Sequence, residues 1–170
     1  MIEVTHIKQS KPTYCGPACL QVVLDYFGVK TTQAKLAKKS GTTFRSGTPN
    51  LGLVRTMRGL GFNVITKENS TTFGDIRKYV MGKKVPVIVD WFSSYEHPAN
   101  GHYSVVIDIN KTHISLYDPG VNKVRKIPLK EFIQLWFDFD GDIALDKLPV
   151  RMYFRWMMAA IPQKKKVNKF

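Results

Sequence analysis

The sequence predicts an α+β fold, in which a helical N-terminal part packs on a mostly antiparallel sheet. Two observations support this prediction. Apolar residues recur with helical spacing up to about residue 60, and from residue 62 onward short β-branched runs alternate with turn residues. The 170 residues are 44% hydrophobic, which is enough for one core. We therefore expect a single domain over residues 1–162, followed by a basic tail at residues 163–170.

Three helices are expected in the N-terminal part. Residues 15–27 carry apolar side chains at helical spacing and are followed by Gly28, a typical helix stop. A shorter helix is expected over residues 32–39. The third, over residues 49–60, has Thr48 as its expected N-cap.

Strands dominate the rest of the chain. They are recognised by β-branched enrichment and by the turn residues between them. A final apolar, aromatic-rich run over residues 154–161 is also interpreted as a strand. The other expected strands cover residues 63–66, 85–91, 102–108, 112–118 and 123–127, and the two helices that interrupt them cover residues 72–81 and 129–137.

The charge of the chain is strongly basic. The sequence has 26 Lys and Arg against 13 Asp and Glu, a net charge of +13, and no acidic residue lies between Tyr26 and Lys67. Such an excess attracts an acidic peptide, a nucleic acid or an anionic membrane surface, and charge alone does not choose among these partners.

Composition excludes several classes of protein. The apolar stretches are far shorter than the ~20 residues that a membrane-spanning helix needs, so no membrane span is expected. Residues 1–12 lack the apolar core of a secretion signal, which predicts a cytoplasmic protein. With 2 cysteines, a disulfide framework is excluded.

The start of the first expected helix carries a candidate nucleophile. Cys15 lies where free backbone N–H groups and the helix dipole favour an anion, and both lower the pKa of a thiol. Gly16 would let a substrate backbone approach closely. The side-chain amide of Gln9 is predicted to lie beside the Cys15 backbone N–H, where the two donors would form an oxyanion hole. Cys19, one turn later, is expected in the core.

His102 and Asp118 supply the matching base and its orienting acid. His102 opens one expected strand and Asp118 ends the next. A three- or five-residue turn centred on Asn110 would put His102 directly opposite Asp118 on one face of the hairpin, whereas a two-residue turn would send Asp118 to the other face. On the shared face, Asp118 would orient the imidazole and His102 would accept the proton of Cys15.

Together these motifs resemble the peptidase C39 family of papain-like cysteine peptidases. The resemblance implies a papain-like fold in which Cys15 is the nucleophile, His102 the general base and then acid, Asp118 the orienting acid and Gln9 the oxyanion donor. The motifs that carry it are, in chain order, Gln9, Cys15-Gly16-Pro17-Ala18-Cys19-Leu20, Asp25-Tyr26-Phe27-Gly28, Gly101-His102-Tyr103-Ser104-Val105-Val106 and Tyr117-Asp118-Pro119.

The resemblance also implies a class of substrate. Members of the family typically remove leader peptides after a double glycine, as domains fused to ABC exporters. This sequence shows no exporter segment, and Tyr14 stands where the exporter-linked peptidases typically have Asp. It therefore resembles the freestanding C39-like proteins, whose peptide or protein substrates are more varied.

An acidic run near the C-terminus is a candidate calcium loop, because alternating carboxylates can converge on a hard cation. The run lacks the turn glycine and the bidentate Glu of an EF-hand, so a solvated acidic loop is favoured over a calcium site. The predicted peptidase chemistry requires no cofactor. The four candidate ligands are Asp138, Asp140, Asp142 and Asp146.

The predicted function is hydrolysis of peptide bonds by Cys15, His102 and Asp118. Two alternatives stay open. One is another acyl transfer on the same triad, such as transpeptidation or deamidation. The other is a basic nucleic-acid-binding module with an incidental cysteine, which the absence of any recognised nucleic-acid motif disfavours.

Overall fold

Helices come first in the chain and strands follow, as the sequence predicts. The computed structural model describes residues 1–95, 100–140 and 151–163, with the backbone alone at residue 140. The helices of these residues are α1 (Cys15–Tyr26), α2 (Gln33–Ser40), α3 (Asn50–Gly59), α4 (Phe73–Arg77), the π-helix η1 (Lys78–Lys83) and α5 (Leu129–Leu135).

The described strands form two sheets in which every pair is antiparallel. The larger sheet has the strand order β1-β8-β2-β3-β4-β5, and β6 pairs with β7 in a separate hairpin. The strands are β1 (Phe62–Lys67), β2 (Val87–Ser93), β3 (Asn100–Ile109), β4 (His113–Asp118), β5 (Lys123–Pro128), β6 (Phe137–Asp140), β7 (Arg151–Phe154) and β8 (Met157–Pro162).

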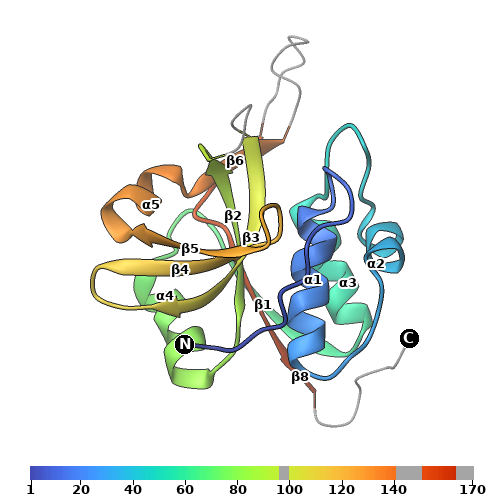
Figure 1. Cartoon of the computed structure of the whole chain (residues 1–170), viewed down its shortest axis with the longest axis horizontal. Helices are drawn as coiled ribbons and strands as arrows, with labels where there is room; N and C mark the ends of the chain where they lie inside the picture. The colour runs from blue at the N-terminus through green and yellow to red at the C-terminus, as the bar shows by residue number, and fades with distance from the viewer. Residues whose placement is uncertain (96–99, 141–150, 164–170) are drawn as a thin grey trace.

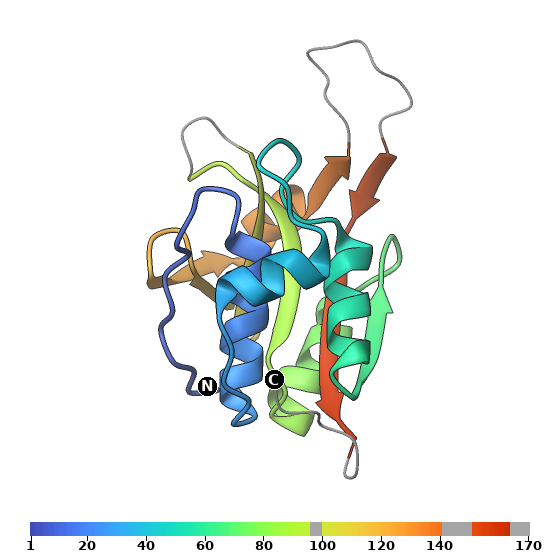
Figure 2. The ribbon, with the colours of Figure 1, turned by 90° about the vertical axis from the view of Figure 1, so that its right-hand side faces the viewer.

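The helical part and the sheet meet along α1. Figure 1 shows α1, α2 and α3 grouped on one side of the central strands, with α4 and α5 on the other side. In the turned view of Figure 2 the three N-terminal helices lie in front of the strands. Leu20 and Leu24 of α1 are fully buried, as are Val105 and Val106 of β3. Each such side chain contributes ~1.5–3 kcal/mol by burial, which fixes α1 on the sheet.

The third helix begins one residue later than predicted. Pro49 is the N-cap of α3, and no side chain caps that end of the helix. The Thr48 hydroxyl instead lies 2.8 Å from the Thr42 hydroxyl. The prediction of Thr48 as the cap was therefore wrong, because a tertiary contact holds its side chain away from the first turn.

Two elements later in the chain also differ from the prediction. The helix expected over residues 72–81 divides into α4 and η1, although Thr72 and Asp75 do form a capping box at its start. The run expected as one strand over residues 154–161 is broken at Arg155, whose φ of 54° is left-handed. This break separates β7 from β8 and lets β7 pair with β6, a hairpin that the sequence did not predict.

The turn between β3 and β4 differs from the one expected. Asn110 is bonded to His113 across the turn (N to O, 3.0 Å), so the turn is centred between residues 111 and 112 and not on Asn110. The pairing begins with Ile109 opposite Ile114, and a β-bulge between Val106 and Asp108 then shifts the register by one residue. Beyond the bulge, the side chains that share a face of the two strands are those that would share it if the turn had an odd number of residues.

Two further predictions concern membrane-spanning helices and the basic C-terminal tail. Within the described residues, no helix is both long and apolar enough to cross a membrane. The predicted basic tail lies outside the described residues from residue 164 onward.

Candidate active site

Cys15 is the first residue of α1, the helix that the sequence predicts most clearly. Its N-cap, Tyr14, makes no capping side-chain hydrogen bond, so the helix N-terminus keeps backbone donors beside the thiol. The sulfur accepts hydrogen bonds from the backbone N–H groups of Gly16 and Tyr103. These donors favour the thiolate over the thiol.

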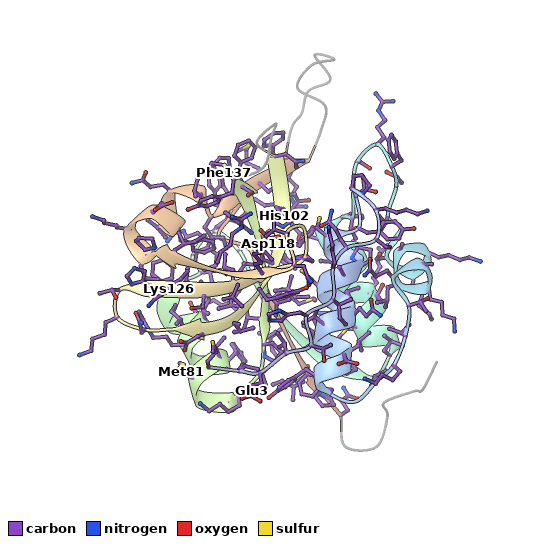
Figure 3. The ribbon with its side chains drawn as sticks, viewed as in Figure 1. Glu3, Met81, His102, Asp118, Lys126 and Phe137 are labelled. Atoms are coloured by element: carbon purple, nitrogen blue, oxygen red, sulfur yellow. The ribbon has the colours of Figure 1, made fainter. Side chains whose placement is uncertain are left out.

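His102 and Asp118 are directly hydrogen bonded. The imidazole Nε2 lies 2.7 Å from Asp118 Oδ1, and both side chains are buried. Because Nε2 faces the carboxylate, Nδ1 is the ring nitrogen that can face Cys15, with which His102 makes its other side-chain hydrogen bond. Figure 3 shows His102 and Asp118 side by side, near the end of α1 that carries Cys15. The structure therefore brings the three predicted triad residues together in the order Cys15, His102, Asp118.

The electrostatics favour an ion pair between the thiol and the imidazole. Burial raises the pKa of Cys15, but the hydrogen bond to His102 and its charge outweigh burial and lower the pKa below its ordinary value. Burial likewise lowers the pKa of His102, and the hydrogen bonds to Asp118 and Cys15 reverse this and raise it to about 10. Both shifts favour a thiolate and an imidazolium over a neutral thiol and imidazole.

Asp118 has two further partners that the sequence did not reveal. Arg125 Nε donates to Asp118 Oδ2 at 2.5 Å, and the Gly120 N–H donates to Oδ1 at 2.8 Å. Burial raises the pKa of Asp118, but His102 and Arg125 together lower it to about 2. Arg125 lies on β5 opposite Leu116, so only the β4–β5 register brings it to Asp118. Its spacing in the sequence carries no such signal.

Gln9 lies close to the triad segment but bonds elsewhere than predicted. Its backbone N–H donates to the Pro119 carbonyl at 2.9 Å, which anchors it next to Asp118. Its side-chain amide donates to the carbonyls of Lys11 (3.1 Å) and Pro12 (2.9 Å). Both amide hydrogens are therefore used in the turn that leads to Cys15.

Gly16 has a packing role as well as the predicted one of access. A Cβ added at Gly16 would lie 2.9 Å from the Thr48 Cβ. The absence of a side chain thus lets the first turn of α1 pack against the loop before α3.

Cys15 and Cys19 differ sharply in environment. Both are free thiols. Cys19 is fully buried, and burial raises its pKa well above the ordinary value. Cys19 is therefore the core residue that the sequence predicts.

The reacting groups are nearly enclosed. Cys15 is 9% exposed and His102 6% exposed. The two hollows that we describe, of about 510 and 320 Å³, are lined by other residues.

The acidic run predicted as a calcium loop is described only in part. The Asp138 carboxyl packs against Gly101 and the Asp90 carboxyl. The Asp140 side chain, Asp142 and Asp146 lie outside the described residues. Where side chains are described, no three His, Cys, Asp or Glu residues cluster as a metal site.

Comparison with known proteins decides the family. A sequence model of the peptidase C39 family matches residues 3–139. The chain belongs to the peptidase C39 family. An uncharacterised protein of Methanothermobacter marburgensis is 32% identical over 121 residues, which cover 70% of this chain and 74% of that protein.

A transport protein is also among the relatives of this chain. The lactococcin-G-processing and transport ATP-binding protein LagD of Lactococcus lactis is 29% identical over 76% of this chain, which spans only 17% of that exporter. A crystal structure described as a C39-like peptidase from Bacillus anthracis superposes with a TM-score of 0.72 at 16% identity, covering 97% of this chain and 98% of the other. The papain-like fold expected from the resemblance is thereby confirmed.

Proposed function

We propose that this C39 family member is a cysteine peptidase that hydrolyses peptide bonds with Cys15, His102 and Asp118. One observation carries the proposal. The buried His102 imidazole makes two side-chain hydrogen bonds, one through Nε2 to Asp118 at 2.7 Å and one to Cys15. Nucleophile, base and orienting acid in such a row are the requirement for acyl transfer by a cysteine.

The reaction follows from the resting ion pair. The Cys15 thiolate attacks the scissile carbonyl carbon, and the imidazolium gives its proton to the departing amine as the C–N bond breaks. Neutral His102 then takes a proton from water, whose oxygen attacks the thioester and releases the acid and the thiolate. Asp118 keeps the imidazole oriented and stabilises its charge throughout.

Gln9 is the proposed side-chain donor to the oxyanion. The other donor would be the Cys15 backbone N–H at the start of α1. Because both amide hydrogens of Gln9 bond to the Lys11 and Pro12 carbonyls, one of these bonds must be shared or released when the oxyanion forms.

The proposed substrate is a peptide, or an exposed segment of a protein, with acidic residues near the cleaved bond. LagD processes and transports lactococcin G according to its name, and this chain spans 17% of that protein. Cleavage after a double glycine is one form of the proposal. The net charge of +13 favours acidic partners and predicts that cleavage weakens as salt is added.

A cleavage profile of a diverse peptide library, read by mass spectrometry, tests the proposal. The wild-type chain should yield new carboxyl termini, C15S should yield none, and C19S is the matched control one helical turn away that should resemble wild type. Products joined to an added amine would instead show aminolysis, the acyl-transfer alternative. Equal activity of C15S and wild type would contradict the assignment of Cys15 as the nucleophile.

Calcium binding by the acidic run at residues 138–146 is a separate proposal. A rise in melting temperature on addition of calcium would support it, and an unchanged melting temperature would contradict it.

A further inference from the structure

Asp90 of β2 is a buried acid that the proposed reaction does not use. It is 2% exposed. Asn50 Nδ2 donates to its Oδ2 at 2.7 Å, and its Oδ1 meets no N–H or O–H donor among the described residues. A buried carboxylate oxygen without a donor costs free energy of folding, so the environment of Asp90 needs an explanation.

The Asp90 carboxyl is also hydrogen bonded to the Asp138 carboxyl of β6. Two carboxyls can form a hydrogen bond only when one of them holds a proton. Burial, and then the charge and hydrogen bond of Asp138, raise the pKa of Asp90 well above its ordinary value, and the Cys15 charge acts in the same direction. Asp90 is therefore linked by hydrogen bonds to Asn50 of α3 on one side and to Asp138 of β6 on the other.

The pair bears directly on the residue before His102. A Cβ added at Gly101 would overlap both carboxylate oxygens of Asp138. Gly101 lies on β3, opposite Phe92 in the β2–β3 ladder. The Asp138 carboxyl therefore supports the backbone from which the imidazole projects.

The residue after His102 is bound to the same network. The Tyr103 hydroxyl lies 2.9 Å from Asn50 Oδ1 and 2.9 Å from the Thr48 carbonyl oxygen. Thr48 packs on Gly16, the neighbour of Cys15. The contacts thus run from one flank of His102 to the other and reach the helical part that carries the nucleophile. We call these five residues the carboxyl ring: Asn50, Asp90, Gly101, Tyr103 and Asp138.

We propose that Asp90 and Asp138 are positioning residues that, through the carboxyl ring, hold His102 against Cys15. The proposal deepens the proposed function, because it rests on Cys15 being the nucleophile. The titratable groups that face Asp90 are Asp138 from β6, Cys15 from α1 and Tyr103 from β3.

The test uses the full chain and needs no substrate. The rate of Cys15 alkylation by iodoacetamide at mildly acidic pH reports the thiolate that His102 maintains. D90A removes the acid, and Y103F removes the hydroxyl contacts while keeping the backbone donor to Cys15. Each should slow labelling about ten-fold, because small displacements of paired groups are costly in rate. D90N keeps a side-chain oxygen that accepts the Asn50 N–H, so it retains the network and should label within about two-fold of wild type.

A matched control separates positioning from general loss of stability. V80A shortens a buried side chain in η1, outside the carboxyl ring, and should lower the melting temperature without slowing Cys15 labelling. Wild-type rates in both D90A and Y103F, or a V80A rate as slow as theirs, would overturn the proposal. A D90N rate as slow as that of Y103F would also overturn it, and this comparison decides if D90A fails to fold. Absence of selective Cys15 labelling in wild type would instead contradict the proposed nucleophile.

Discussion

His102 Nε2 lies 2.7 Å from Asp118 Oδ1, although the turn between β3 and β4 has an even number of residues, which does not favour this contact. The turn alone would place them on opposite faces of the β3–β4 hairpin. The bulge between Val106 and Asp108 adds one residue to β3 and restores the shared face. Continuing the Val105–Tyr117 register by one residue puts Asp118 opposite Ser104, so His102 reaches it diagonally and not directly as predicted.

Selective alkylation should identify the reactive thiol. At mildly acidic pH, iodoacetamide should label Cys15 and spare Cys19, because His102 lowers the pKa of Cys15 while burial raises that of Cys19. Mass spectrometry of the digested chain measures both sites. Equal labelling, or labelling of Cys15 only after unfolding, would contradict the ion pair.

Arg125 should matter to the site although it is remote from the sulfur. R125M removes the 2.5 Å bond to Asp118 Oδ2 and should lower stability by ~1–3 kcal/mol. It should also raise the pKa of Asp118 and slow Cys15 labelling. K126M, at the exposed next position of β5, is the control and should change neither the free energy of unfolding nor the labelling rate. Identical behaviour of the two variants would show that Arg125 does not position Asp118.

Gln9 should contribute to turnover and not to thiol activation. Q9A is expected to slow peptide hydrolysis by ~10²–10³ while leaving Cys15 labelling unchanged, because an oxyanion donor acts only after attack. Q9E keeps the size of the side chain but loses its N–H donors, and should be equally slow. If Q9A instead unfolds the chain or abolishes labelling, the bonds to Lys11 and Pro12 are the main role of Gln9.

The stability of the protein should depend on pH through His102. Its pKa is raised from 6.5 to about 10, so its contribution is complete below 6.5 and is lost as the pH rises toward 10. The free energy of unfolding of wild type minus that of H102Q, from urea titrations, should therefore shrink across this window. A difference that stays constant over the window would rule out the raised pKa.

Asp118 should make the stability of the protein depend on pH in the acidic range, and in the opposite direction to His102. Its pKa is lowered from 3.8 to about 2, so its contribution is present above 3.8 and is lost as the pH falls toward 2. D118N should therefore be less stable than wild type near neutral pH, and the two should converge in acid. Urea titrations measure the free energy of unfolding of both proteins, and a difference that grew as the pH fell toward 2 would contradict the lowered pKa of Asp118.

Local sequence signals predicted the order of helices and strands, the start of α1 at Cys15 and the end of a strand at Asp118, whereas His102 is the third residue of β3 and not its first as predicted. These features follow from periodicity, turn residues and helix-end chemistry, which act over a few neighbouring positions. Only the tertiary structure decided the bulge that gives His102 and Asp118 a common face, the Arg125 contact, and the placement of Asp138 on Gly101 and Asp90. Each of these depends on the register between strands that are distant in the chain, and register is set by packing across the whole sheet.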